Sequence, residues 1–171
     1  MERIKSLGLY GVKFHSEYQH FCPDDEKMFP VYEKIAELGL IAVFHGGWDP
    51  FADGEIRATP QRFAHLAQLF PQLKISAAHL GGLTMWDDVE EHLAGRFDNV
   101  WLDVGVISRY ITPGQLLRII RKQGADKVLF GSDCPWDEPA NEIALIENLP
   151  LSDTEKEMIF FRNAENLLGL N

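Results

Sequence analysis

The stretches IAVFHGG at residues 41–47, ISAAHLGG at residues 75–82 and VLFGSD at residues 128–133 decide the fold of this chain. In each stretch an apolar run stops at a histidine or an aspartate, with glycine close by. A short apolar run bounded by turn residues is typical of a buried strand. The C-terminal ends of all strands lie on one face of a parallel α/β protein. We therefore expect the two histidines and the aspartate to converge on a single site.

The residues at these strand ends are His45, His79 and Asp133. Two imidazoles and one carboxylate suit zinc or a similar divalent ion. Each residue also has a structural interpretation, because a histidine at a strand end is often a hydrogen-bonded core residue and Asp133 could cap a loop or helix. Three such residues at three strand ends are less readily explained in this way. Together they favour a metal-dependent enzyme.

Side-chain alternation along the strands supports the same site. Alternate residues of a strand face one side of the sheet, so His45 groups with Val43, and His79 groups with Ala77 and Ile75. Small or branched neighbours suit the interior of a barrel. Both imidazoles are therefore expected to point inward from their strands.

Other polar and aromatic residues accompany these three. Lys13 and His15 share one face of the first strand, and Asp103 ends the fourth. Lys13 either points into the cavity or pairs with an aspartate at a neighbouring strand end. Trp48 and Trp136 closely follow the key residues and could wall a substrate pocket, although aromatic residues in loops often pack against the body of a protein.

Strand and helix patterns alternate along the chain. Apolar runs rich in Val, Ile and Phe occur near residues 10–15, 40–45, 74–79, 99–104 and 127–131. Helix starts are indicated at Thr59-Pro60 and Thr112-Pro113, where an N-cap residue precedes proline at the first helical position. Ser152 and Glu155 match a capping box, which opens a final helix through about Leu168.

Five strand–helix units predict crossover helices, a parallel sheet and one domain over residues 1–171. The length fits an open, doubly wound sheet, since a closed eight-stranded barrel usually needs about 250 residues. The positions of the polar residues, in contrast, favour a barrel over an open sheet. A reactive side chain ends nearly every strand, whereas ligands of an open sheet gather at one switch point.

The charge and composition of the chain argue against some classes of binding partner. A net charge of −10 and a pI near 5.0 disfavour nucleic acid and anionic membranes. No apolar stretch approaches the roughly 18 residues of a membrane span. Cys22 and Cys134 are far apart, which fits a reduced compartment. We expect a cytoplasmic protein that acts on a small-molecule substrate, with neither nucleic acid nor a membrane as partner.

A series of motifs then points to a family. They are GVKFH at 11–15, FCPDD at 21–25, VFHGG at 43–47, AHLGG at 78–82, FGSDCPW at 130–136 and RNAENLL at 162–168. Their order resembles the C-terminal part of the amidohydrolase superfamily, in the amidohydrolase-2 group that includes decarboxylases related to aminocarboxymuconate-semialdehyde decarboxylase. The resemblance spans essentially the whole chain.

The resemblance implies a (β/α)8 barrel of the TIM type with a divalent metal, zinc in the first place, at the C-terminal strand ends. His45 would match the metal-binding histidine of the fifth strand. His79 would match the sixth-strand histidine, which binds a second metal or acts on substrate. Asp133 would match the eighth-strand aspartate, a metal ligand and proton carrier. Lys13 lies in the fourth-strand region, where some members use a carboxylated lysine.

One departure from the family pattern affects the expected function. The family's first strand carries a His-x-His pair of metal ligands, and this sequence contains no His-x-His. The chain therefore resembles a truncated barrel of strands four to eight, whose open edges favour self-association or a complementing partner. Metal-dependent hydrolysis by an activated water is the expected activity. Decarboxylation and a non-catalytic α/β domain are the alternatives.

Overall fold

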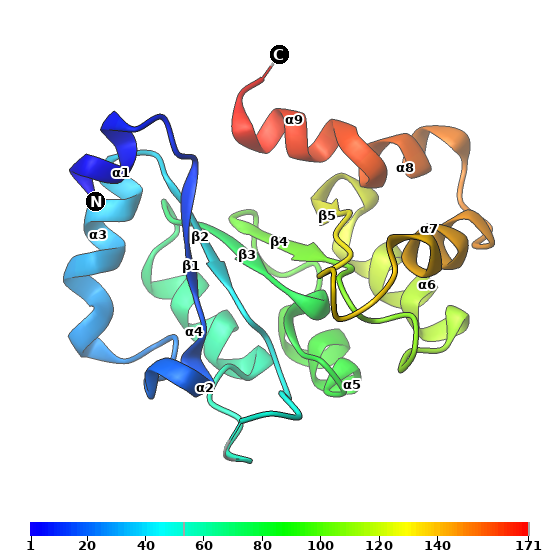
Figure 1. The fold of residues 1–171 in the computed structure, drawn as a ribbon, viewed down its shortest axis with the longest axis horizontal. Helices are drawn as coiled ribbons and strands as arrows, with labels where there is room; N and C mark the ends of the chain where they lie inside the picture. Colours follow the sequence, from blue (N-terminus) through cyan, green and yellow to red (C-terminus); the bar gives the residue numbers. More distant parts are fainter. Residues whose placement is uncertain (53, 171) are drawn as a thin grey trace.

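The computed structural model describes residues 1–52 and 54–170, and its strands form one parallel, five-stranded sheet (Figure 1). The strands are β1 (Gly11–Phe14), β2 (Ile41–Phe44), β3 (Lys74–Ala77), β4 (Val100–Asp103) and β5 (Val128–Leu129). They lie side by side in sequence order, and each falls within its predicted interval. A doubly wound sheet changes direction at a switch point. The sequential order therefore excludes that alternative and matches the wall of a barrel.

Helices and short turns connect the strands. They are α1 (Glu2–Ser6), α2 (Ser16–Gln19), α3 (Phe29–Glu37), α4 (Pro60–Leu69), α5 (Trp86–Asp88), α6 (Pro113–Gln123), α7 (Pro139–Glu147), α8 (Asp153–Glu157) and α9 (Asn163–Leu168). A π-helical turn, Met158–Arg162, joins α8 to α9 as one continuous helix. The final helix therefore runs to Leu168 as the sequence predicted.

The predicted helix starts are confirmed by their capping hydrogen bonds. The Thr59 hydroxyl accepts the backbone N–H of Arg62 at 3.4 Å, and the Thr112 hydroxyl accepts that of Gln115 at 3.2 Å. At the start of α8, the side chains and backbones of Ser152 and Glu155 form both hydrogen bonds of a capping box. Each cap satisfies a backbone donor that has no partner within its helix.

The main core lies on the face of the sheet that the helices cover. The strand register aligns Phe14, Phe44, Ala77 and Leu102 in one row, and all four are buried. In Figure 1, α3, α4, α5 and α6 lie along one side of the sheet, and the α8–α9 helix lies on the other side near β5. The strands are held in place mainly by this apolar layer.

The second face carries polar side chains toward the C-terminal strand ends and apolar ones elsewhere. Leu167 of α9 forms a small apolar cluster there with Ile41 and Leu129, against which Trp101 packs. The adjacent row includes Lys13, which is exposed and registered opposite Val43. Because α9 covers only the apolar part, the C-terminal strand ends remain accessible. Within the described residues, no helix is both long and apolar enough to cross a membrane.

Candidate functional site

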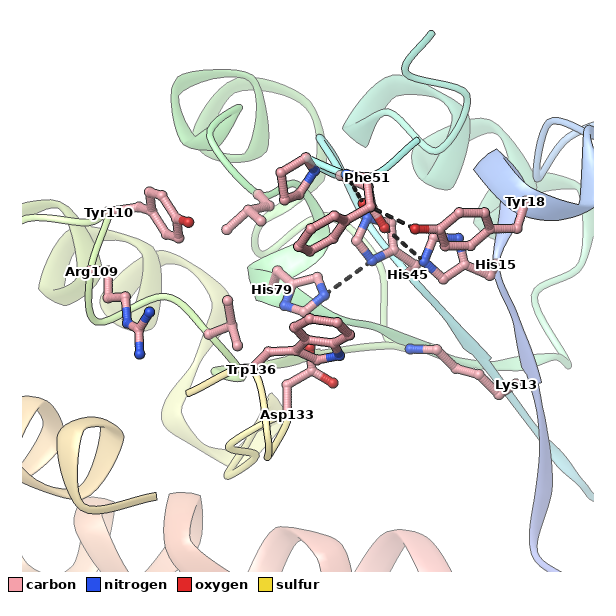
Figure 2. Close-up of a pocket in the computed structure, with 14 residues that line it drawn as sticks. Lys13, His15, Tyr18, His45, Phe51, His79, Arg109, Tyr110, Asp133 and Trp136 are labelled. Atoms are coloured by element: carbon pink, nitrogen blue, oxygen red, sulfur yellow. Dashed lines mark hydrogen bonds and ion pairs between the residues drawn. The ribbon is translucent and has the colours of Figure 1, made fainter. Parts of the chain in front are cut away.

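A pocket of about 340 Å³ opens at the C-terminal ends of the strands (Figure 2). Its walls include six of the residues singled out from sequence: Lys13, His15, His45, His79, Asp133 and Trp136. Further walls come from Tyr18, Asp49, Pro50, Phe51, Leu83, Val106, Arg109 and Tyr110. The structure therefore brings residues from both ends of the chain to one cavity, as expected for parallel strands.

His45 and His79 are in direct contact. Nε2 of His79 lies 3.1 Å from Nδ1 of His45, and both side chains are buried. On its other side, Nδ1 of His79 lies 2.6 Å from the carbonyl oxygen of Gly105. The remaining ring nitrogen of His45, Nε2, is buried and has no hydrogen-bond partner among the residues that the structure describes.

His79 reaches the pocket by a different route from the one that alternation predicted. The strand ends at Ala77, and Ile75 and Ala77 belong to the helix-covered core rather than to an inner face. Grouping His79 with these two residues was therefore wrong. The backbone of His79 instead adopts a left-handed conformation with φ of 58°, which takes the residue out of the strand pattern.

Asp103 holds the backbone of His79 in place by a hydrogen bond. Oδ1 of Asp103 accepts the backbone N–H groups of His79 and Gly105, both at 3.1 Å. These bonds connect the segment after β3 to the segment after β4. Asp103 itself does not line the pocket, so its contribution to the site is made through His79 and Gly105.

Several pocket residues have backbone conformations that L-amino acids rarely adopt. His79, Val106 and Asp133 all have positive φ values, of 58°, 56° and 56°. Each such residue costs of order 1–3 kcal/mol, and this kind of strain is concentrated at functional sites. The clustering of three of them around one cavity marks it as the candidate functional site.

Asp49 is a site residue that the sequence analysis missed. Oδ2 of Asp49 lies 3.1 Å from Nε2 of His15, and the Tyr18 hydroxyl donates to Oδ1 of Asp49 at 3.3 Å. Asp49 lies in the long loop between β2 and α4, beyond any strand pattern. The only available signal was its position four residues after His45.

His15, His45 and Asp49 form a group of three potential metal ligands. One donor atom from each lies within 4.8 Å of the other two, and among the described residues this is the group that meets that spacing. The rings of His15 and His45 are stacked, however, with centroids 4.3 Å apart and planes only 10° apart. An ion in the plane of one ring would lie outside the plane of the other, so both imidazoles cannot ligate one ion without a ring rotation.

Burial, and then the neighbouring His79, His15 and Lys13, lower the pKa of His45 to about 2, while the backbone of Trp48 acts in the opposite direction. The ring is therefore neutral at physiological pH, which is the state in which imidazole binds a metal. Lys13 has no hydrogen bond or ion pair with any described residue. The alternative in which Lys13 pairs with an aspartate is therefore absent from this structure.

Aromatic side chains form the outer wall. The backbone N–H of Trp136 donates to the carbonyl of Asp133 at 2.9 Å, and this turn brings the indole over the cavity. Its ring centroid lies 5.1 Å from that of Phe51, and both side chains are largely exposed. Trp48 does not line the pocket and instead contacts Tyr110 edge to face, with 6.5 Å between the ring centroids.

A parallel sheet in sequential strand order, with a histidine-rich pocket at its C-terminal strand ends, is the architecture of part of a (β/α)8 barrel. The chain belongs to the amidohydrolase family, whose model matches residues 1–170. This confirms the family resemblance and, with the solved structures below, the truncated barrel predicted from the motifs.

Individual relatives show the same relationship. The chain is 26% identical to 2-amino-3-carboxymuconate-6-semialdehyde decarboxylase of Dictyostelium discoideum, over 98% of the chain and 55% of that protein. An uncharacterized TIM-barrel protein from Bordetella bronchiseptica is 21% identical, with a TM-score of 0.85 over 99% of the chain and 60% of its own. A dihydroxybenzoic acid decarboxylase from Polaromonas, solved with manganese and 2-nitroresorcinol, is 18% identical, with a TM-score of 0.71 over 98% and 63%. The chain thus spans just over half to under two thirds of these relatives.

Proposed function

We propose that this chain carries the metal-binding half of an amidohydrolase-2 active site that removes a carboxyl group from a small, unsaturated carboxylate. The observation that carries the proposal is the pocket itself, in which the unpartnered Nε2 of His45 lies among a cation, a carboxylate and exposed aromatic rings. The decarboxylases among the relatives support this choice of reaction.

The residues present fit a divalent ion. Nε2 of His45 is a buried nitrogen with no partner within residues 1–52 and 54–170, and its lone pair is available to bind a metal. Asp133 and Asp49 line the same cavity and offer carboxylate donors. The stacked ring of His15 could join them only after a rotation. When bound, the ion would supply positive charge at the reacting carboxylate or carbonyl oxygen. Zinc is the ion proposed from the donor types, and manganese in the Polaromonas enzyme makes manganese the first competitor.

The chain's own residues then hold the substrate and move one proton. The unpaired ammonium of Lys13 would bind an anionic oxygen of the substrate, and Phe51 and Trp136 would pack on its planar part. In decarboxylation the bond between the carboxyl carbon and the adjacent carbon breaks. CO2 leaves, and the bonding electron pair remains on the adjacent carbon. Asp133 lines the pocket and would pass to this carbon a proton drawn from water.

Hydrolysis is the second candidate, because the same donors suit it. Asp133 would then take a proton from water as the oxygen attacks a carbonyl carbon. Both reactions are proposed for the site that this chain carries, although the chain spans only part of its relatives.

We also propose that the sheet edges at β1 and β5 are covered in the working protein. Each of these strands pairs with a single neighbour among the described residues. Unpaired edge strands present free N–H and C=O groups to other strands. Self-association or a complementing polypeptide would satisfy them and complete the wall of the pocket.

An activity screen tests the proposed reaction. The protein, loaded with zinc or manganese, is incubated with 2,6-dihydroxybenzoate and with a matched panel of hydroxybenzoate methyl esters, and released CO2 and methanol are measured. CO2 release that His45→Ala abolishes and that the control His92→Ala, outside the pocket, retains would support decarboxylation. Methanol release alone would favour hydrolysis, and neither product with either ion would contradict both activities for this chain.

A further inference from the structure

We infer that His79 and Asp103 are positioning residues, which hold His45 in the tautomer that carries its hydrogen on Nδ1 and leaves the lone pair on Nε2. The ligand role of that lone pair rests on the proposed metal site. The tautomer does not, because it follows from hydrogen bonds that require no ion.

The first step concerns His79. A carbonyl oxygen can only accept a hydrogen bond, and the oxygen of Gly105 lies 2.6 Å from Nδ1 of His79. Nδ1 of His79 therefore carries a hydrogen. A neutral imidazole carries only one ring hydrogen, so in the neutral form of His79 the other nitrogen, Nε2, presents a lone pair.

The second step derives the tautomer of His45 from that of His79. The lone pair of His79 Nε2 faces Nδ1 of His45 at 3.1 Å, so Nδ1 of His45 must donate. In the neutral ring of His45, with its single hydrogen on Nδ1, Nε2 has no hydrogen. That nitrogen is the buried atom without a partner. The chain of contacts thus explains why a polar atom is left unsatisfied inside the wall of the pocket.

The third step concerns what holds this relay in position, where the relay is the hydrogen-bonded chain from Gly105 through His79 to His45. Oδ1 of Asp103 accepts the backbone N–H of His79 and that of Gly105, which is the residue whose carbonyl receives the His79 ring. One carboxylate therefore sets the positions of both the donor and the acceptor of the 2.6 Å bond. It also stabilises the left-handed backbone of His79. A side chain at Gly105 would crowd this arrangement, since an added Cβ would lie 3.3 Å from Cβ of Asp133.

The relay assigns His79 a different role from direct ligation. Both of its ring nitrogens are already engaged, one by Gly105 and one by His45. A metal on Nε2 of His79 would have to replace the bond to His45. Histidine ligands in metal sites are generally oriented by a partner at the second nitrogen, and loss of that partner typically weakens metal binding 10–100-fold.

Nitrogen-15 NMR of the imidazoles in the metal-free, 171-residue chain tests the tautomer. We expect His45 to show a protonated Nδ1 and an unprotonated Nε2. His79→Gln retains an oxygen that can accept from His45 and should preserve this state, whereas His79→Leu removes the acceptor and should give a mixture of tautomers. Asp103→Ala should shift the same His45 signals although it does not touch that ring, while the control His92→Leu, outside the pocket, should leave them unchanged. A wild-type His45 protonated on Nε2 would overturn the inference.

Zinc titration of the same variants separates positioning from ligation. His79→Gln should bind zinc within a few-fold of wild type, His79→Leu about 10–100-fold more weakly, and His45→Ala without measurable affinity. If His79→Gln loses as much affinity as His45→Ala, His79 is a ligand and the inference fails. If the tautomer is as expected but the wild type binds neither zinc nor manganese, the positioning relay stands and the proposed metal site fails.

Discussion

Oε1 of Glu17 lies 3.1 Å from the backbone nitrogen of Ala58, and this hydrogen bond ties the turn after β1 to the far end of the loop that follows β2. The same oxygen accepts the backbone N–H of Arg57 at 3.0 Å. Near the start of the loop, Asp49 is held by His15. The loop that carries Asp49 and Phe51 to the pocket is thus anchored at both ends by the residues just after β1.

Replacing Glu17 should therefore destabilise the protein. Glu17→Ala leaves two backbone N–H groups without an acceptor, one of them in fully buried Ala58. Leaving a buried donor unsatisfied costs about 1–3 kcal/mol. Glu17→Gln retains the accepting oxygen and serves as the matched control. Urea unfolding should show a clear loss of stability for Glu17→Ala and a much smaller one for Glu17→Gln; equal losses would mean that the charge, and not the two hydrogen bonds, holds the loop.

The aromatic core behind the site predicts a larger effect. Phe44 is fully buried, with ring centroids of Phe14 and Phe63 at 5.0 and 5.7 Å. Removing a buried Phe side chain typically costs about 3–5 kcal/mol, because transfer free energy is lost and a cavity remains. Phe44→Ala should lower the free energy of unfolding by about that amount. Leu69→Ala, at a 43% exposed position, should change it by no more than about 0.5 kcal/mol. Similar values for the two variants would contradict the proposed core.

Acid unfolding should depend on Asp137. Burial alone would raise the pKa of this carboxyl, but hydrogen bonds from Asn141, Ser108, the Glu138 backbone and Arg109 lower it to about 2. The folded protein thus binds fewer protons than the unfolded chain between the ordinary value of 3.8 and about 2. Asp137 then contributes stability above this range, and the contribution is lost as the pH falls through it.

The measurement is the free energy of unfolding as a function of pH. Asp137→Asn should be less stable than wild type at neutral pH and should show a shallower decline across this acid range. Glu91→Gln, on the exposed surface, is the control and should leave the slope unchanged. A wild-type slope in Asp137→Asn would show that this carboxyl titrates at its ordinary pKa in the folded protein.

Open edges at β1 and β5 predict association. Light scattering across a range of concentrations should give a mass above that of the 19.4 kDa chain, rising with concentration. Adding a charge beside the outer edge, as in Tyr10→Lys at a 51% exposed position next to β1, should reduce the association because edge charges oppose strand pairing. A monodisperse monomer at every concentration would contradict the proposal that these edges pair.

The sequence predicted the fold closely because its signals were local. Each strand was an apolar run bounded by turn residues, and Thr59, Thr112 and Ser152 each marked a helix start with a side chain that caps it. Helix α7 was missed, because its start at Pro139 has no capping hydrogen bond and its apolar residues do not form a clear stripe. Length alone favoured the wrong topology, and only the positions of polar residues indicated a barrel.

The site was less predictable than the fold because it depends on backbone departures from the strand pattern. Alternation placed Lys13 and His15 correctly on one face, and both line the pocket. It failed for His79, whose left-handed backbone takes it out of the β3 pattern. Asp49 was missed since a long loop has no periodicity from which its direction could be inferred.

Metal stoichiometry tests the central claim most directly. Elemental analysis is made on protein purified without a histidine tag and dialysed against zinc or manganese, with His45→Ala and His92→Ala treated in parallel. The account predicts close to one ion per chain for wild type and His92→Ala, and none for His45→Ala. Equal metal content in wild type and His45→Ala, or no metal in any of them, would contradict a metal site built on the free nitrogen of His45.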